Sequence, residues 1–169
     1  MARMTRIPPR TAAAAAALAA AIALGAAFSA EWWGGLVPCA LCLVERWPYR
    51  VAIAFGVLGA LLPPWLGRIA LAGVLLAGLA AIGLAGTHVG VEFGWWPSPL
   101  PECAAPKFAE GSIADRLRSM PAHPSKSCED PVYPIEAIPL SFAQAGFIYA
   151  MLFSAGVGVM LARSGRRDA

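Results

Sequence analysis

The sequence has few charged residues. Of its 169 residues only 14% are Asp, Glu, Lys or Arg, whereas charged residues make up roughly a quarter of an ordinary soluble domain. It also lacks any long block of like charge, which argues against a nucleic-acid-binding surface. The hydrophobic share of 59% instead indicates an integral membrane protein. A chain of this length predicts one domain, over residues 1–169.

The sequence also offers few residues that hold a resident cofactor. It contains four cysteines and two histidines, and no flavin motif. Cys39 and Cys42 have CxxC spacing, but Leu43 stands where attachment of c-type haem needs histidine. Cys103 and Cys128 are too far apart for the second pair of a zinc ribbon. We therefore expect no metal site.

Four apolar stretches predict the fold. Each is long enough to cross a bilayer, and we expect transmembrane helices at residues 11–30, 39–62, 69–88 and 141–162. Their small residues recur four apart and predict close helix packing, as in Gly73, Ala77, Ala81 and Ala85, and in Gly146, Ala150, Ser154, Gly158 and Ala162. The fold class is thus an all-α bundle of four transmembrane helices with two extracytoplasmic loops. Small residues near position 30 leave a cleaved signal peptide as the alternative for the first stretch.

The arginines predict the orientation in the membrane. One side of the predicted bundle carries seven of them against Asp168 alone: Arg3, Arg6, Arg10, Arg68, Arg163, Arg166 and Arg167. By the positive-inside rule both termini are cytoplasmic and all four cysteines face outward. In a bacterial inner membrane the outer side is oxidising, so disulfides persist there.

The CxxC pair lies at the predicted outer end of the second helix. A helix start stabilises a thiolate, the species that attacks disulfides, and Arg46 follows Cys42 by one helical turn. Glu45 either orients Arg46 or faces the lipid headgroups, and we favour the headgroups. Pro48 is expected to kink the helix just beyond the motif.

The second cysteine pair lies in a predicted redox loop at residues 89–140. Cys103 and Cys128 are expected on a mobile part of this loop that reaches a soluble protein, and a short amphipathic helix is expected from Ser112 onward. Four cysteines allow three pairings, so the sequence leaves the connectivity open.

Three uses of the cysteines compete. Inert disulfides could staple the loops, but a CxxC ring closes too small a loop to stabilise much. Metal binding matches the cysteine spacing poorly. Thiol–disulfide exchange between the two pairs fits best, and a dithiol at the membrane surface without a flavin points to a lipid-soluble quinone as electron acceptor.

The block CALCLVER, a third helix ending in THVGVE and the proline-rich loop with two cysteines resemble the bacterial disulfide bond formation protein family DsbB. The resemblance implies that Cys39, Cys42, Cys103 and Cys128 are catalytic, and that Arg46 and His88 lie at the quinone site. It implies a periplasmic DsbA-like thioredoxin-fold partner, membrane lipid and ubiquinone or menaquinone as contacts, no nucleic acid, and an inner-membrane location.

Two other classes stay open from the sequence. A vitamin K epoxide reductase-like enzyme has similar parts, although its CxxC belongs to a later helix. A non-enzymatic membrane protein stapled by cysteines or binding a metal is the third class, and serine substitution of Cys39 and Cys42 would distinguish it from an enzyme.

Overall fold

The computed structural model describes residues 7–103, 112–114, 126–134 and 138–164. Within these ranges the chain forms helices and no strand: α1 (Pro9–Trp32), α2 (Ala40–Val44), α3 (Arg46–Leu61), α4 (Pro64–Glu92), the 3₁₀ turn η1 (Pro101–Cys103) and α6 (Phe142–Ser164). This confirms the all-α prediction for the described residues. The amphipathic helix expected after Ser112 falls mainly on residues outside the described ranges.

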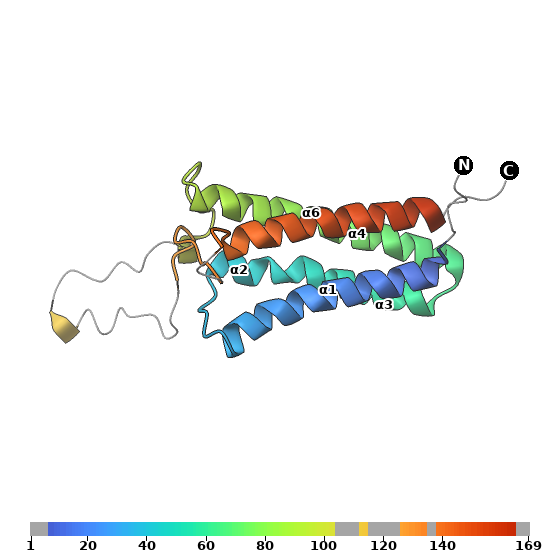
Figure 1. Ribbon diagram of the computed structural model, residues 1–169, viewed down its shortest axis with the longest axis horizontal. Coiled ribbons are helices and arrows are strands. Elements are labelled where there is room, and N and C mark those ends of the chain that lie inside the picture. Colours follow the sequence, from blue (N-terminus) through green and yellow to red (C-terminus); the bar gives the residue numbers. More distant parts are fainter. Residues whose placement is uncertain (1–6, 104–111, 115–125, 135–137, 165–169) are drawn as a thin grey trace.

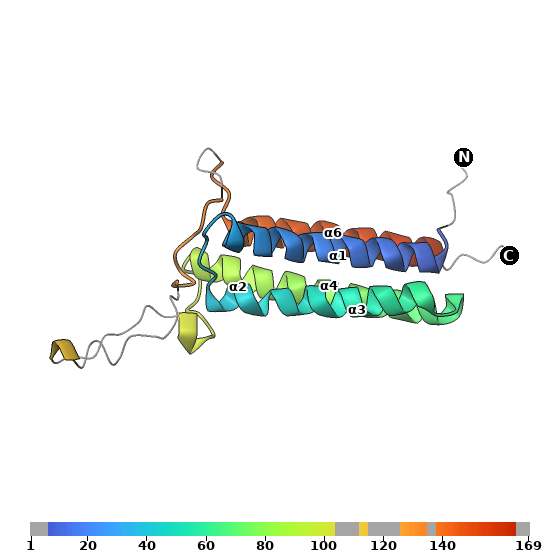
Figure 2. The same ribbon diagram turned by 90° about the horizontal axis from the view of Figure 1, so that it is seen from below.

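The long helices lie side by side in two layers. Figure 2 shows α1 and α6 in one layer and α3 and α4 in the other. Each layer packs on the other, because α1 contacts α3 and α4 contacts α6. Figure 1 shows that α1 and α6 separate toward the end of the molecule that carries α2 and η1. This separation makes room for the candidate site.

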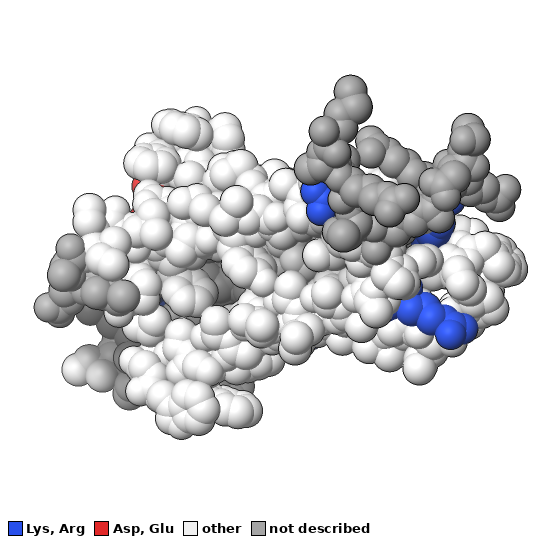
Figure 3. Space-filling view, turned by 45° about the vertical axis from the view of Figure 1, so that its right-hand side comes forward, with Lys and Arg blue, Asp and Glu red and all other residues white. Residues whose placement is uncertain are grey.

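Three helices, α1, α4 and α6, are long and apolar enough to cross a membrane. The fourth predicted crossing is divided: α3 has only 16 residues, and the five-residue α2 precedes it. Arg10, Arg68 and Arg163 lie at the opposite end from α2, whereas Arg46 and Arg50 follow α2 at the start of α3. At the end opposite α2, Arg10 Nε donates to Leu62 O at 2.9 Å, and Figure 3 shows the blue side chains toward this end with a mainly uncharged surface along the middle.

The predicted helix at 39–62 is therefore wrong in one respect, because it is interrupted at Glu45. The interruption comes three residues before Pro48 and just beyond the CxxC motif, where a kink was expected, and Glu45 itself keeps helical φ and ψ of −60° and −18°. Proline at position 48 has no N–H for the carbonyl of Val44, and its ring crowds that carbonyl. The series of backbone hydrogen bonds along the helix is consequently interrupted at Glu45, and α2 and α3 are separate helices.

The third helix is longer than predicted at both ends. It begins at Pro64, the residue after Pro63, because proline suits the first position of a helix, where its missing N–H is not needed. It continues to Glu92 and ends just before Gly94, whose φ of 68° is readily adopted only by glycine. His88 consequently lies inside α4, a turn before its end. The predicted loop at 89–140 begins correspondingly later.

The helices approach each other through small residues. The core between the layers is lined mainly by alanines of α1 with Leu71 and Val74 of α4 and Phe153 of α6. A Cβ atom added at Gly78 would lie 2.5 Å from Ser154 Oγ on α6. The close packing that the small-residue spacing predicted is confirmed for Ala77, Ala81 and Ala150, which are all buried. Larger side chains at this interface would push the layers apart.

Gly56 on α3 provides a test of this packing. A Cβ atom added there would lie 2.8 Å from Ala17 Cβ and 2.9 Å from Ala13 O on α1. The backbone of α1 can move only slightly to make room for it. We expect Gly56→Ala to lower the free energy of unfolding by about 1–3 kcal/mol, measured by thermal unfolding in detergent. Gly83→Ala is the matched control, because nothing lies within 4 Å of a Cβ there. Equal stability of the two variants would contradict the packing.

Candidate redox site

The four cysteines form two disulfides at the same end of the helices. Cys39 pairs with Cys42, and Cys103 pairs with Cys128. Cys39, Cys103 and Cys128 pack with Leu41 and Val91 into one buried apolar cluster, which we call the cysteine cluster. The structure thus places the two disulfides beside each other and supplies the connectivity that the sequence left open.

Backbone contacts hold the loop pair against the CxxC motif. Cys39 forms a parallel β-bridge with Lys126, and the N–H of Cys128 donates to Cys103 O at 3.2 Å. Ser127 Oγ donates to the same carbonyl at 3.2 Å. Cys103 and Cys128 are 0% and 1% exposed. The expectation that they lie where a soluble protein can reach them is therefore wrong for this arrangement, since their sulfurs are covered by the cluster.

The CxxC motif begins α2. Cys39 is the N-cap residue, and its Sγ accepts a hydrogen bond from the N–H of Cys42 at 3.1 Å. A sulfur in this position stands where the partial positive charge of the first helical turn favours a thiolate. The predicted placement of the pair at a helix start is confirmed, although the helix that it starts is only one turn long.

His88 on α4 lies between the carboxylate of Glu45 and the sulfur of Cys39, the two residues that flank α2. Glu45 Oε1 lies 2.7 Å from His88 Nδ1, and His88 Nε2 lies 3.5 Å from Cys39 Sγ. An ionised carboxylate only accepts hydrogen bonds, so Nδ1 carries a proton and donates it. Nε2 is then the ring nitrogen that faces the sulfur. Our preference for Glu45 at the headgroups is wrong: its carboxylate contacts buried His88.

Arg46 points to a different carboxylate. Its Nη1 donates to Glu31 Oε2 at 3.2 Å and its Nη2 pairs with Glu31 Oε1, so that the ion pair is bidentate. The guanidinium carbon also lies 4.9 Å from the centre of the Phe28 ring. Arg46 is 7% exposed, and its Nε has no hydrogen-bond partner among the described residues. A fixed buried cation with one spare N–H donor therefore lines the site.

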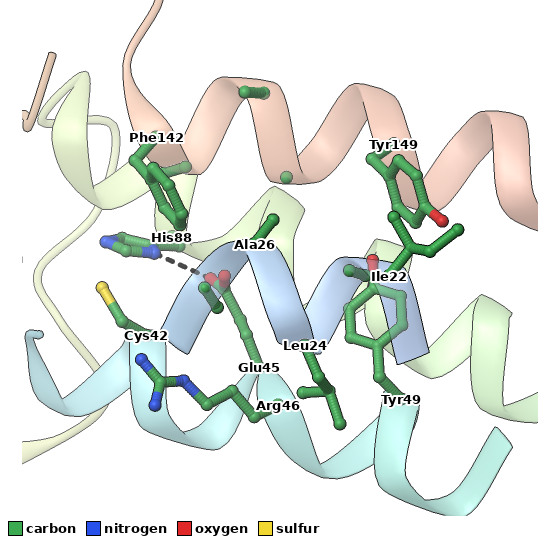
Figure 4. A pocket seen from close by; sticks show the side chains of 15 residues that line it. Ile22, Leu24, Ala26, Cys42, Glu45, Arg46, Tyr49, His88, Phe142 and Tyr149 are labelled. Atoms are coloured by element: carbon green, nitrogen blue, oxygen red, sulfur yellow. Dashed lines mark hydrogen bonds and ion pairs between the residues drawn. The ribbon is translucent and has the colours of Figure 1, made fainter. Parts of the chain in front are cut away.

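A cavity of about 270 Å³ joins these groups. Figure 4 shows Cys42, Glu45, Arg46 and His88 at one end of it and the two tyrosines at the other. Between these ends the wall is apolar. It consists of residues of α1 and α6: Ile22, Ala23, Leu24, Ala26, Ala27, Phe142, Ala143, Ala145 and Gly146. The cavity thus presents a sulfur, a cation and an imidazole to an otherwise hydrophobic space.

Two tyrosines form the inner end of the cavity. Tyr149 OH donates to Ala19 O at 2.7 Å, which ties α6 to α1 where the helices converge. The rings of Tyr49 and Tyr149 lie 6.1 Å apart, and Phe153 contacts both. Tyr49 faces the cavity, whereas Trp47, two residues earlier on α3, is exposed.

The structure brings together every residue that the sequence singled out. Cys42, Arg46 and His88 line the cavity, and Cys39, Cys103 and Cys128 lie in the adjoining cysteine cluster. Sequence reasoning missed Glu31, Tyr149 and the contact of Glu45 with His88. The spacing of Glu45 from Cys42 places both on one helical face and is the signal that could have found Glu45.

A CxxC disulfide at a helix start, beside a second disulfide and an apolar cavity, has the arrangement expected of a membrane disulfide oxidoreductase. The comparison of the sequence with known families agrees: residues 9–160 match the family described as Disulfide bond formation protein DsbB. This match covers most of the chain, so the protein belongs to the DsbB family. No curated protein and no solved structure matched the chain.

The ion pair between Arg46 and Glu31 predicts a stability effect. Glu31→Ala leaves the guanidinium in its buried place without a carboxylate, and we expect a loss of about 2 kcal/mol in the free energy of unfolding. Thermal unfolding in detergent measures it. Glu129→Ala is the control, since Glu129 is exposed near the same disulfides. A Glu31→Ala protein as stable as this control would show that the pair does not hold α1 to α3.

Proposed function

We propose that this protein reoxidises a periplasmic DsbA-like dithiol protein and passes the electrons to a membrane quinone. One observation carries the proposal: the Cys39–Cys42 disulfide adjoins both the loop disulfide and the cavity. Cys39 packs with Cys103 and Cys128 in the cysteine cluster, whereas Cys42 lines the cavity with Arg46. A pair in this position can take electrons from one side and release them on the other.

The proposal places the whole chain, residues 1–169, as one domain in the bacterial inner membrane. In it α2 and α3 together make a fourth crossing beside α1, α4 and α6. The end with Arg10 and Arg68 is cytoplasmic, as the positive-inside rule predicts. Both termini are then cytoplasmic, and the two disulfides face the oxidising periplasm, where disulfides persist.

In the proposed exchange the partner's thiolate attacks Cys103, and Cys128 leaves as a thiolate. Cys128 then attacks Cys39, which releases Cys42 as a thiolate at the cavity. The partner's second thiol releases the oxidised partner from Cys103, and Cys103 displaces Cys39 from Cys128. These steps restore the loop disulfide and leave Cys39 and Cys42 reduced. Because Cys103 is buried, the first attack requires η1 to move away from the cysteine cluster.

The residues of the cavity fit a quinone headgroup. The walls are apolar, and the volume of about 270 Å³ is near the lower end of ligand pockets, enough for a ring but not for a long isoprenoid tail. Arg46 Nε offers a buried N–H without a partner among the described residues, which suits a carbonyl oxygen. A bound quinone would supply the oxidising chemistry by accepting two electrons and two protons.

The protein's own groups prepare this transfer. The Arg46 cation stabilises the Cys42 thiolate and any negative charge that develops in the cavity. Glu45 fixes the ring of His88 through Nδ1, so that Nε2 of the neutral ring faces Cys39 as a proton acceptor. The apolar wall keeps water away from Arg46 and His88, which strengthens the charge interactions of these two residues. Arg46 and His88 thus act as the quinone-site residues in this proposal.

Quinone consumption tests the relay directly. Purified protein in detergent is mixed with a reduced DsbA-like partner and a soluble quinone analogue, and quinone absorbance is followed with time. We expect consumption by the wild type and loss of it in both Cys42→Ser and Cys103→Ser, because each removes one link in the exchange. A well-folded wild type that leaves this quinone oxidised would overturn the proposal.

The role of Arg46 is tested by separating the two half-reactions. Arg46→Ala should slow quinone reduction by about 10²-fold, since it removes the positive charge at the transfer site, while exchange between partner and loop cysteines changes little. Arg50→Ala is the matched control, because Arg50 is exposed and stacks on Trp47 outside the cavity. Equal losses in both half-reactions of Arg46→Ala would contradict the assigned role.

A further inference from the structure

We propose that the reduced form of the CxxC motif binds a zinc ion with Cys39, Cys42 and His88 as ligands. This goes beyond electron transfer to quinone and differs from the expectation of no metal site. That expectation considered only the spacing of the cysteines. It did not consider that a histidine from α4 lies against the CxxC motif.

The positions of the ligand atoms carry the inference. The two sulfurs and one ring nitrogen all lie within 4.8 Å of one another. His88 Nε2 is 3.5 Å from Cys39 Sγ. In a tetrahedral site with Zn–S near 2.3 Å and Zn–N near 2.0 Å, neighbouring sulfur and nitrogen ligands are about 3.5 Å apart. Nitrogen and sulfur therefore already stand at the separation that one zinc ion requires.

The surroundings of His88 support the same conclusion. Histidines that bind zinc nearly always donate their other ring N–H to a carboxylate or carbonyl, which fixes the tautomer. Here Nδ1 donates to Glu45 Oε1 at 2.7 Å, so that in the neutral ring Nε2 carries the lone pair toward the cysteines. Glu45 is thus a positioning residue for the metal ligand. A fourth position remains for water, as in zinc sites with three protein ligands.

The oxidation state decides whether the ion binds. Sulfurs joined in a disulfide are not thiolate ligands, so zinc has no site in the oxidised protein. Two electrons and two protons from a reducing dithiol convert the disulfide to two thiols. Zinc binding then releases the two thiol protons as the thiolates coordinate the ion. If the proposed function holds, the bound ion withholds the dithiol from reoxidation and inhibits the enzyme.

Metal binding is tested without any measurement of activity. The protein in detergent is reduced with a phosphine, the reductant is removed, and zinc is titrated against a chelating dye under anaerobic conditions. Cadmium is titrated in parallel, because its bonds to thiolates give an ultraviolet charge-transfer band. We expect one ion per reduced chain with the thiolate band, and neither in the oxidised protein. Equal binding to both forms, or none to well-folded reduced protein, would overturn the proposal.

Variants identify the ligands. His88→Ala and Glu45→Gln should each weaken zinc binding by about tenfold or more. Two controls should bind as the wild type: His123→Ala, which alters the chain's other histidine, and the double variant Cys103→Ser with Cys128→Ser. Loss of zinc in this double variant would indicate a site made by both cysteine pairs and would overturn the assignment. Unchanged affinity in a folded His88→Ala protein would overturn it as well.

Discussion

The rest of the site depends on two charged residues, Glu45 and Arg46, that follow the CxxC motif at the junction of α2 and α3. Consecutive residues of a helix point about 100° apart around its axis, so that they contact different neighbours. At the break, Glu45 reaches His88 on α4 and Arg46 reaches Glu31 on α1. One residue pair therefore connects the CxxC motif to two different helices. The ion pair and the imidazole contact join these helices beside the cavity.

Burying an arginine in such an apolar protein has a cost that the structure offsets in a specific way. Glu31 neutralises the guanidinium through two contacts, and the face of the Phe28 ring covers it. Nε is left without a partner among the described residues and is directed neither to solvent nor to a carboxylate. Buried polar atoms are usually hydrogen-bonded, so this one marks a place where a ligand oxygen would be stabilised.

The burial of both disulfides separates the two chemical tasks. Cys103, Cys128 and Cys39 lie in an apolar cluster, which shields the sulfurs from other thiols in solution. Cys42 alone among the four also lines the cavity. In the proposed exchange, attack by a partner's thiolate therefore requires the segment around η1 to rearrange. Within the same shielded region His88 Nε2 lies 3.5 Å from Cys39 Sγ.

Much of this protein was determined by the sequence alone. Low charge and long apolar runs specify membrane helices, because a bilayer leaves the backbone few other ways to satisfy its hydrogen bonds. The CxxC motif, the loop cysteines and Arg46 were recognisable from their residue types and spacing, whereas His88 was predicted only from the resemblance to the DsbB family. The ends of α4 were predicted wrongly, although local rules explain them afterwards: Pro64 suits the first position of a helix, and Gly94 follows the C-cap Phe93 with a positive φ.

The tertiary structure decided the partners of these residues. No sequence spacing relates Glu31 to Arg46, Glu45 to His88 or Tyr149 to Ala19, since each contact joins different helices. The pairing of four cysteines has three solutions on paper, and only packing selects one. The break at Glu45 arises because Pro48 has no N–H for the carbonyl of Val44, four residues earlier, although the residues on either side are helical. Short stretches of sequence thus identified the reactive residues, whereas the contacts between these residues depend on how helices far apart in the chain pack together.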